Sequence, residues 1–212
     1  MNHTTVCVVK VGGSLLDYER LAGELCRWLD ADRQNHYARH YVLIAGGGKW
    51  ADAVRQADRE APIGDEAAHW LCVQAMSTTA ELLAQRAPDA RLITDFGTLR
   101  ERLARPGQTI FDCRSFLREH ESQAPGTPLP CSWDVTSDSI AARLAIVLGA
   151  EELVLLKSAP PPADSWSDLA TADYVDRFFE KLTAELPATR IVNLRDDRFP
   201  ATLVLSQSTS FR

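Results

Sequence analysis

The chain has 212 residues, of which 45% are hydrophobic and 25% charged, and its formal net charge is −6. A chain of this length fits one α/β domain with a sizeable core. Its acidic balance, without a basic run or tail, argues against general binding of nucleic acid or anionic membranes. Because no apolar run approaches a membrane span and the N-terminus lacks a targeting pattern, we expect a cytoplasmic protein that does not enter a membrane.

The first predicted element is a buried parallel-type strand over residues 4–11, which is rich in β-branched residues. It contains Lys10 and ends at Gly12 and Gly13. The glycines allow a sharp turn that presents backbone N–H groups to an anion, and Lys10 adds a positive charge. This pattern is typical of a phosphate site, although a turn beside an ordinary surface lysine has the same sequence.

A second apolar strand, residues 41–45, leads directly into Gly46, Gly47 and Gly48 and then into a helix that begins near Trp50. Two strands therefore end in glycine loops that suit the close approach of a polyanion. The spacing Gly46-x-Gly48-x-x-Ala51 also meets the loose dinucleotide fingerprint, so a nicotinamide-binding Rossmann domain is the alternative fold. Against it, the loop follows the second strand, and no acidic residue ends a further strand about 20 residues on.

Helical and strand patterns alternate along the rest of the chain. We predict helices over residues 17–30, 50–61, 65–85, 99–105, 114–121, 140–149 and 174–185, and strands over 91–94, 108–111, 152–156, 190–194 and 201–205. This alternation indicates an α/β architecture with a mainly parallel sheet. The polar tail after Ser206 is expected to fray.

Residues 122–130 contain three prolines and one glycine, and they mark the predicted junction between two lobes. We expect a single domain, 1–212, with an N-terminal lobe over about 1–128 and a shortened C-terminal lobe over about 129–212. The five cysteines are scattered and form no C-x-x-C pair, so they are interpreted as buried free thiols. His36 and His40 lack a partner pattern for metal binding.

Three features occur in one order along the chain: Lys10 with Gly12 and Gly13, the triple glycine 46–48, and Asp138 at the start of an alanine-rich helix. Together they resemble the amino acid kinase family, which includes acetylglutamate, aspartate, carbamate, uridylate and isopentenyl phosphate kinases. The resemblance extends from about residue 4 to about residue 158. It implies a three-layer αβα sandwich whose N-terminal lobe binds a phosphoryl acceptor and whose C-terminal lobe binds ATP.

The resemblance also implies roles for single residues. The catalytic residues would be Lys10, Asp138 and Lys157. The residues that bind the phosphates of ATP would be Lys10, Gly12, Gly13, Ser14, Lys157 and Ser158. The residues that bind the acceptor would be Gly46, Gly47, Gly48, Trp133 and Asp134. Asp138 would orient the catalytic lysine and lie near Mg²⁺, which is held mainly by ATP. Transfer to an existing oxyanion needs alignment and charge neutralisation, so the absence of an obvious base histidine agrees with these roles.

Two departures from the family pattern concern the C-terminal lobe. After the strand that ends at Leu156, the chain lacks the usual Asp-rich turn and the later Gly-Gly-Met stretch with its second phosphate-binding lysine. Lys157 is the predicted substitute for that lysine, with Lys181 and Arg195 behind it. The short length and residues 133–139 most resemble the aminomethylfuran phosphate kinase subgroup of methanofuran biosynthesis. Relatives commonly form oligomers, so we expect a homo-oligomer.

The function predicted on this basis is ATP-dependent transfer of a γ-phosphoryl group to a small phosphate or carboxylate, with Mg²⁺. The alternative is a catalytically inactive protein of the same fold that binds nucleotide for regulation or storage. Asp138 has the alternative role of a first-turn carboxylate that stabilises its helix. A solvated lysine at a strand end is the alternative for Lys157, and filling the seam between lobes is the alternative for Trp133.

Overall fold

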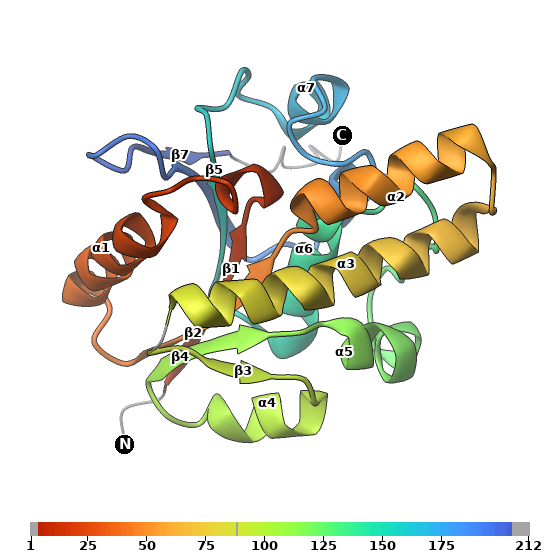
Figure 1. Ribbon diagram of the computed structural model, residues 1–212. Coiled ribbons are helices and arrows are strands. Elements are labelled where there is room, and N and C mark those ends of the chain that lie inside the picture. Colours follow the sequence, from red (N-terminus) through yellow and green to blue (C-terminus); the bar gives the residue numbers. More distant parts are fainter. Residues whose placement is uncertain (1–3, 88, 205–212) are drawn as a thin grey trace, which may run out of the picture.

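One sheet with seven strands forms the centre of the computed structural model, which describes residues 4–87 and 89–204 (Figure 1). The strand order is β3-β4-β2-β1-β5-β6-β7, and every neighbouring pair is parallel except β6 and β7. The strands are β1 (Thr5–Val11), β2 (Arg39–Ala45), β3 (Arg91–Ile93), β4 (Gly107–Phe111), β5 (Glu152–Lys157), β6 (Ala188–Asn193) and β7 (Ala201–Leu203). The predicted mainly parallel sheet is confirmed.

The strand order also decides between the two folds that the glycine loops allowed. A Rossmann domain has the order 3-2-1-4-5-6, in which the first strand is flanked by the second and fourth. Here β1 lies between β2 and β5, and β4 lies on the far side of β2. The alternative of a nicotinamide-binding Rossmann domain is therefore wrong.

Helices cover both faces of the sheet (Figure 1). They are α1 (Leu21–Asn35), α2 (Gly48–Glu60), α3 (Asp65–Arg86), α4 (Phe96–Arg102), α5 (Arg114–Glu119), α6 (Ser137–Leu148), α7 (Trp166–Thr171) and α8 (Phe179–Leu182), with the 3₁₀ turns η1 (Gly13–Leu15) and η2 (Glu121–Gln123). The long helices α2 and α3 form an antiparallel hairpin, which lies at the right of Figure 1. This arrangement is the layered α/β sandwich that the sequence predicted.

Alternation along the strands decides which side chains face which helices, since successive residues of a strand point to opposite faces. In β1, Cys7, Val9 and Val11 belong to a buried cluster with residues of α1, whereas Val8 belongs to a second cluster with residues of α6. Lys10 lies two residues after Val8 and points to the same face of the sheet, so it faces α6. In β5, Leu153 and Leu155 belong to the cluster with α6, and Lys157, two residues further on, points to the same face. Both lysines therefore extend toward one helix.

Most predicted elements are confirmed at their centres, and tertiary contacts move their boundaries. The helix predicted over 17–30 begins at Leu21 and extends to Asn35, because η1 and a turn follow β1. The helix predicted over 174–185 is wrong for most of its length, since only Phe179–Leu182 is α-helical. The short helix α7 was not predicted. Leu205, the predicted end of the last strand, and the tail after Ser206 lie outside the described residues.

The predicted junction, residues 122–130, is anchored by buried polar contacts. Arg143 on α6 is fully buried, and its Nε donates to Glu121 Oε1 at 2.8 Å. Its guanidinium also donates to the carbonyl oxygens of Ala124 at 2.9 Å and Pro125 at 2.6 Å. One sheet includes strands from both sides of this segment. The division into two lobes stays a prediction.

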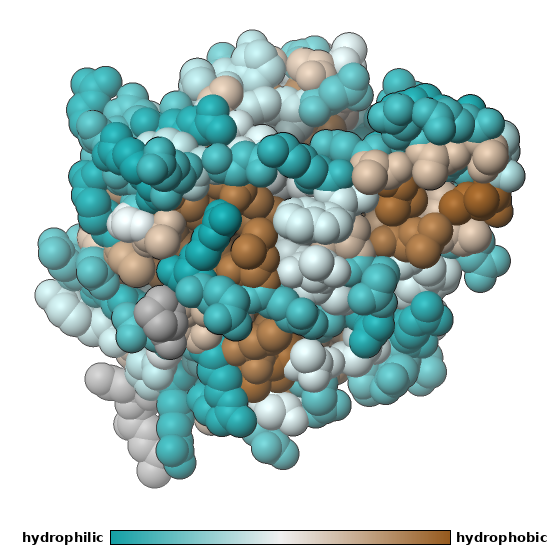
Figure 2. All heavy atoms as spheres, in the orientation of Figure 1, coloured by the Kyte–Doolittle hydropathy of each residue, from teal (hydrophilic) through white to brown (hydrophobic). Residues whose placement is uncertain are grey.

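Hydrophilic side chains cover most of the face in Figure 2, with apolar surface over the α2–α3 hairpin at the right of the view. The exposed large apolar side chains of that hairpin and its connection are Trp50, Ile63 and Leu71. Within the described part of the chain, no helix is long and apolar enough to cross a bilayer.

The cysteines are free thiols, but their predicted burial holds for only some of them. Cys7 and Cys113 are buried, and Cys72 is half-buried. The interpretation of Cys26 and Cys131 as buried is wrong, because both are exposed.

Candidate functional site

The carboxyl ends of β1, β2 and β5 meet at one edge of the sheet. Val11 pairs with both Ala45 and Leu156, so the three strand ends lie side by side. After them come η1, the start of α2, and Ser158, respectively. Ligands of open α/β sheets bind outside the carboxyl ends of the strands. The fold therefore brings the two glycine loops and Lys157 to one edge.

The two glycine loops touch each other, and this contact explains the need for glycine. A Cβ on Gly13 would lie 2.7 Å from the backbone N of Gly48, and one on Gly46 would lie 2.8 Å from the backbone N of Gly13. Gly48 also has a φ of +53°, which a glycine adopts without steric cost. No side chain caps α2, which begins at Gly48, so its first backbone N–H groups remain available to an anion.

Asp138, in the first turn of α6, lies between the two buried lysines. Lys10 Nζ is 2.9 Å from Oδ1, and Lys157 Nζ donates to Oδ2 at 2.9 Å. The contact with Lys10 is an ion pair without the alignment of a hydrogen bond. The side chains of Lys10, Asp138 and Lys157 are 6%, 7% and 11% exposed, so Lys157 is not a solvated lysine. We call these three residues the lysine–aspartate cluster.

Burial and charge act against each other within this cluster. Burial by itself would raise the pKa of Asp138, but the charges of Lys10 and Lys157 outweigh it and lower the pKa to about 2. Burial lowers the pKa of Lys157 to about 8, although the charge of Asp138 partly opposes the shift. At neutral pH two ammonium groups and one carboxylate face each other. The cluster therefore has a net positive charge, which favours a nearby anion.

Asp176, a residue that the sequence did not single out, determines where α6 begins. Its half-buried carboxylate accepts hydrogen bonds from the backbone N of Thr136 at 2.9 Å, of Ser139 at 3.0 Å and of Phe179 at 3.1 Å. The hydroxyls of Thr136 and Ser139 also donate to it. Burial and the charge of Asp138 raise the pKa of Asp176, and the bonds from Ser139 and Thr136 partly offset this. Asp176 therefore joins the start of α6, next to Asp138, to the start of α8.

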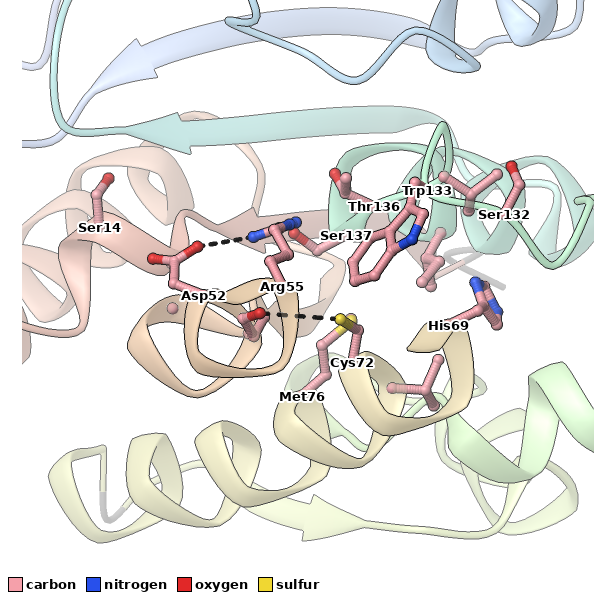
Figure 3. Close-up of a pocket in the computed structure, with 17 residues that line it drawn as sticks. Ser14, Asp52, Arg55, His69, Cys72, Met76, Ser132, Trp133, Thr136 and Ser137 are labelled. Atoms are coloured by element: carbon pink, nitrogen blue, oxygen red, sulfur yellow. Dashed lines mark hydrogen bonds and ion pairs between the residues drawn. The ribbon is translucent and has the colours of Figure 1, made fainter. Parts of the chain in front are cut away.

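A cavity of about 220 Å³ opens between α2, α3 and residues 132–137, and we call it the small cavity (Figure 3). Ser14 and His69 lie at opposite ends of the view, and the indole of Trp133 lies between them. Apolar side chains of the lining are Ala51, Val73, Met76, Val135 and Ile140. Ligand pockets usually enclose roughly 300–1,000 Å³. The small cavity is below this range, so it suits a small molecule.

A wider cavity of about 570 Å³ adjoins the first and shares Arg55, Trp133 and Thr136 with it. The guanidinium of Arg55 lies 5.9 Å from the centroid of the Trp133 ring, so this pair forms part of the shared wall. Arg55 NH1 also donates to Asp52 Oδ1 at 2.7 Å. The other residues that line the wide cavity are Asp134, Asp138, Asp173, Val175, Asp176 and Arg177.

Residues 5–161 match the model of the amino acid kinase family. The matched segment is 157 of the 212 residues and contains both glycine loops and the lysine–aspartate cluster. This chain belongs to that family. Solved structures with a similar fold include the UMP kinases of Ureaplasma parvum (TM-score 0.62, 14% identity, 92% of each chain covered) and Bacillus anthracis (0.60, 13%, 92% of this chain and 89% of that one). The uridylate kinase of Archaeoglobus fulgidus has a TM-score of 0.59 at 18% identity, covering 89% of this chain and 90% of its own.

One relative matches by sequence. The (5-(aminomethyl)furan-3-yl)methyl phosphate kinase of Methanocaldococcus jannaschii is 26% identical over 160 residues, which cover 70% of this chain. The match spans 63% of the length of that relative, which is less than two thirds. The fold of the amino acid kinase family is thus confirmed for this chain, and a sequence relative carries the name of the predicted subgroup.

The fold places the predicted family residues in two groups. Gly13, Ser14, Gly47, Gly48 and Trp133 line the small cavity, and Trp133, Asp134 and Asp138 line the wide one. Lys10, Gly12, Gly46, Lys157 and Ser158 line neither cavity and belong to the strand ends and their first loop residues. The two groups are joined by a contact of 2.9 Å between the hydroxyls of Ser14 and Ser158.

The two cations predicted behind Lys157 have different surroundings. Arg195 donates to the backbone carbonyl of Ser14 at 3.3 Å, so it reaches the loop after β1. Lys181 lies over the ring of Phe178, with Nζ 5.2 Å from the centroid. Arg195 is therefore near the candidate site, and the phosphate role of Lys181 stays a prediction.

Asp138 does not fit a magnesium site of its own. Each of its oxygens faces an ammonium group at 2.9 Å, and those charges repel a cation. The described residues contain no group of three or more His, Cys, Asp and Glu side chains that could hold a metal ion.

Proposed function

We propose that this protein is an ATP-dependent kinase that transfers the γ-phosphoryl group to the phosphate of a small phosphate monoester. The observation that carries the proposal is the contact of the two glycine loops beside the buried lysine–aspartate cluster. Membership of the amino acid kinase family supports the reaction class. The named archaeal relative supports a furan-methyl phosphate as the acceptor.

In the proposed reaction, an oxygen of the acceptor phosphate attacks the γ-phosphorus of ATP. The bond between that phosphorus and the β–γ bridging oxygen breaks, so the products are ADP and a diphosphate. Negative charge is spread over the moving group, and such transfers depend on alignment and on neutralisation of that charge. Lys10, the backbone N–H groups of η1 and those at the start of α2 are the groups proposed to neutralise it.

Asp138 has a supporting role in this proposal. Because its carboxylate stays ionised and contacts both ammonium groups at 2.9 Å, it keeps Lys10 and Lys157 at fixed positions. Lys157 uses further donor capacity on the carbonyl oxygen of Tyr174. Lys10 has no hydrogen bond to a described residue other than its ion pair, so it is the lysine that we assign to the γ-phosphate.

The small cavity is the proposed acceptor site. Its apolar walls and the indole of Trp133 suit a flat ring, and Arg55 is the one cationic side chain among its described lining residues. Mg²⁺ is proposed to enter on the phosphates of ATP and to supply further neutralisation of their charge, since the chain offers it no set of ligands among the described residues. The cytoplasmic location and the homo-oligomer both remain predictions.

The test is formation of ADP from ATP and Mg²⁺ in the presence of (5-(aminomethyl)furan-3-yl)methyl phosphate. Lys10→Met should lower kcat by about 100- to 1,000-fold, as expected when a group that stabilises developing charge is removed. The matched control is Lys49→Met, because the Lys49 side chain is 75% exposed and pairs only with Asp17 at 3.1 Å among the described residues. If the protein binds ATP but releases no ADP with this acceptor, with UMP or with a carboxylate, the inactive alternative is favoured. If Lys10→Met and the wild type have equal rates, Lys10 has no part in the mechanism.

A further inference from the structure

The small cavity has two chemically different ends. The end at Gly13, Ser14 and Gly48 presents backbone N–H groups and lies beside the lysine–aspartate cluster, so we call it the phosphate end. The end at His69 and Ser132 presents an imidazole and a hydroxyl, and we call it the far end. In Figure 3, Ser14 and His69 mark these ends. A molecule that lies along the cavity therefore meets an anion site at one end and neutral polar groups at the other.

His69 is the polar side chain of the far end with a defined protonation state. It is 6% exposed, and this burial lowers its pKa, although a backbone hydrogen bond with Ser132 partly offsets the shift. The imidazole is therefore neutral near pH 7, and a neutral imidazole has one N–H donor and one nitrogen that accepts. The accepting nitrogen of the neutral ring can therefore take a hydrogen bond from another partner.

Two further observations place that nitrogen in the cavity. No side chain among the described residues is hydrogen-bonded to His69, while Trp70 contacts its ring edge-on with the centroids 5.3 Å apart. The buried side-chain nitrogen and oxygen atoms without a partner are, within the described chain, Arg39 Nε and Asp138 Oδ1. The His69 ring nitrogens are not among them, and His69 lines the small cavity, so a ligand in this cavity is in place to bond the accepting nitrogen.

We propose that His69 determines acceptor specificity by accepting a hydrogen bond from an amino group at the end of the acceptor opposite its phosphate. This inference rests on the proposed function, because it assumes that the phosphate end holds the acceptor phosphate. The ring of such an acceptor lies between the two ends, against Trp133, Val73 and Met76. A carboxylate in place of the amino group would meet the lone pair of the imidazole, so acceptors with a second anionic end are disfavoured.

The experiment compares two acceptors, (5-(aminomethyl)furan-3-yl)methyl phosphate and its analogue with a methyl group in place of the aminomethyl group. Calorimetry gives the Kd of each for the wild-type protein, and ADP release gives kcat and KM. The variants are His69→Phe, which keeps a flat ring without the acceptor nitrogen, and His69→Asn, which keeps a hydrogen-bond acceptor. Cys72→Ala changes another residue that lines the small cavity and serves as the matched control.

The wild-type protein should bind the amine about tenfold more tightly than the methyl analogue, which is the effect of one hydrogen bond to a charged group. His69→Phe should reduce this ratio to about one, His69→Asn should keep part of it, and Cys72→Ala should affect both acceptors alike. The inference is overturned if the wild type binds both acceptors equally, or if a folded His69→Phe variant keeps the full ratio. A ratio that depends on His69 without any ADP release would support the inference and overturn the proposed kinase activity.

Discussion

Lys157 is a buried cation whose charge depends on pH within the range in which enzymes are assayed. Burial lowers its pKa to about 8, while the negative charges of Asp138 and Asp176 raise it and the positive charge of Lys10 lowers it. It is protonated below about pH 8 and neutral above. The positive charge of the lysine–aspartate cluster should therefore decrease as the pH rises through that value.

This titration predicts opposite effects on activity and on stability. The kcat/KM for ATP should fall as pH rises through about 8, and Lys157→Met should have a lower rate without that step. In the unfolded chain the pKa of a lysine is about 10.4, so the unfolded state binds more protons between about pH 8 and 10.4. The contribution of Lys157 to stability is therefore least favourable below about pH 8 and improves across this window. Rate profiles and urea unfolding of both proteins measure the two effects, and an identical alkaline step in the variant would contradict the assignment.

Helix α6 illustrates how a helix start becomes part of a site. Thr136 caps it, Asp138 lies in its first turn, and Gly149 ends it in the left-handed conformation with φ of +59°. The sequence predicted the alanine-rich helix over 140–149, because caps and spacing are local signals. The carboxylate of Asp176 comes from a turn about 40 residues away, and it fixes the first residues of α6 by accepting their N–H and O–H groups.

Asp176→Asn should therefore displace Asp138 and lower activity. An amide has one oxygen to accept where the carboxylate has two, and its NH₂ group faces donors, so unfolding should cost about 1–3 kcal/mol less. We expect kcat to fall more than KM for ATP rises, since the change acts on the position of the lysine–aspartate cluster. The control is Asp168→Asn, because Asp168 is exposed in the first turn of α7 and its side chain bonds only Ser165 within the described chain. A variant with lower stability and unchanged kcat would show that Asp176 is structural alone.

Across the whole molecule, the segment predicted as a lobe junction is joined to α6 and to Glu185, which lies between α8 and β6. Glu121 accepts from Arg143 at 2.8 Å and from the backbone N of Leu129 at 3.0 Å. Glu185 accepts from the backbone N of Thr127 at 3.1 Å. Proline and glycine predicted a junction between lobes, and these contacts hold both ends of the segment. Any closure of the molecule around its ligands should therefore bend other loops.

Arg143→Met should destabilise the protein by about 3–5 kcal/mol, because it leaves the buried Glu121 without its cation. Adding Glu121→Gln should recover part of that loss, since the uncompensated charge is removed. The comparison is Arg102→Met at the exposed end of α4, which should change the free energy of unfolding by less than about 0.5 kcal/mol. Urea denaturation followed by circular dichroism measures all three, and a loss of less than about 1 kcal/mol for Arg143→Met would show that the segment does not depend on this contact.

The residues around the candidate site differ in how far they were predictable. Lys10, Gly12, Gly13 and the triple glycine were found because strand alternation, missing side chains and a charge are read within a few neighbouring residues. Arg55, His69 and Asp176 carry no local signal, since a lone arginine or histidine on an amphipathic helix is also typical of a surface or core residue. Their place in the site depends on which helix faces which loop.

The order of hydrophobic strands and helices was sufficient to predict a mainly parallel α/β sheet with two glycine loops, because side-chain periodicity and backbone freedom act between neighbours in the chain. The pairing of Val11 with both Ala45 and Leu156 depends on contacts between distant segments. So do the contact of Gly13 with Gly48 and the position of Asp138 between two lysines. Register, burial and charge at this edge of the sheet exist only once the strands have paired, which is why they could not be read from the order of residues.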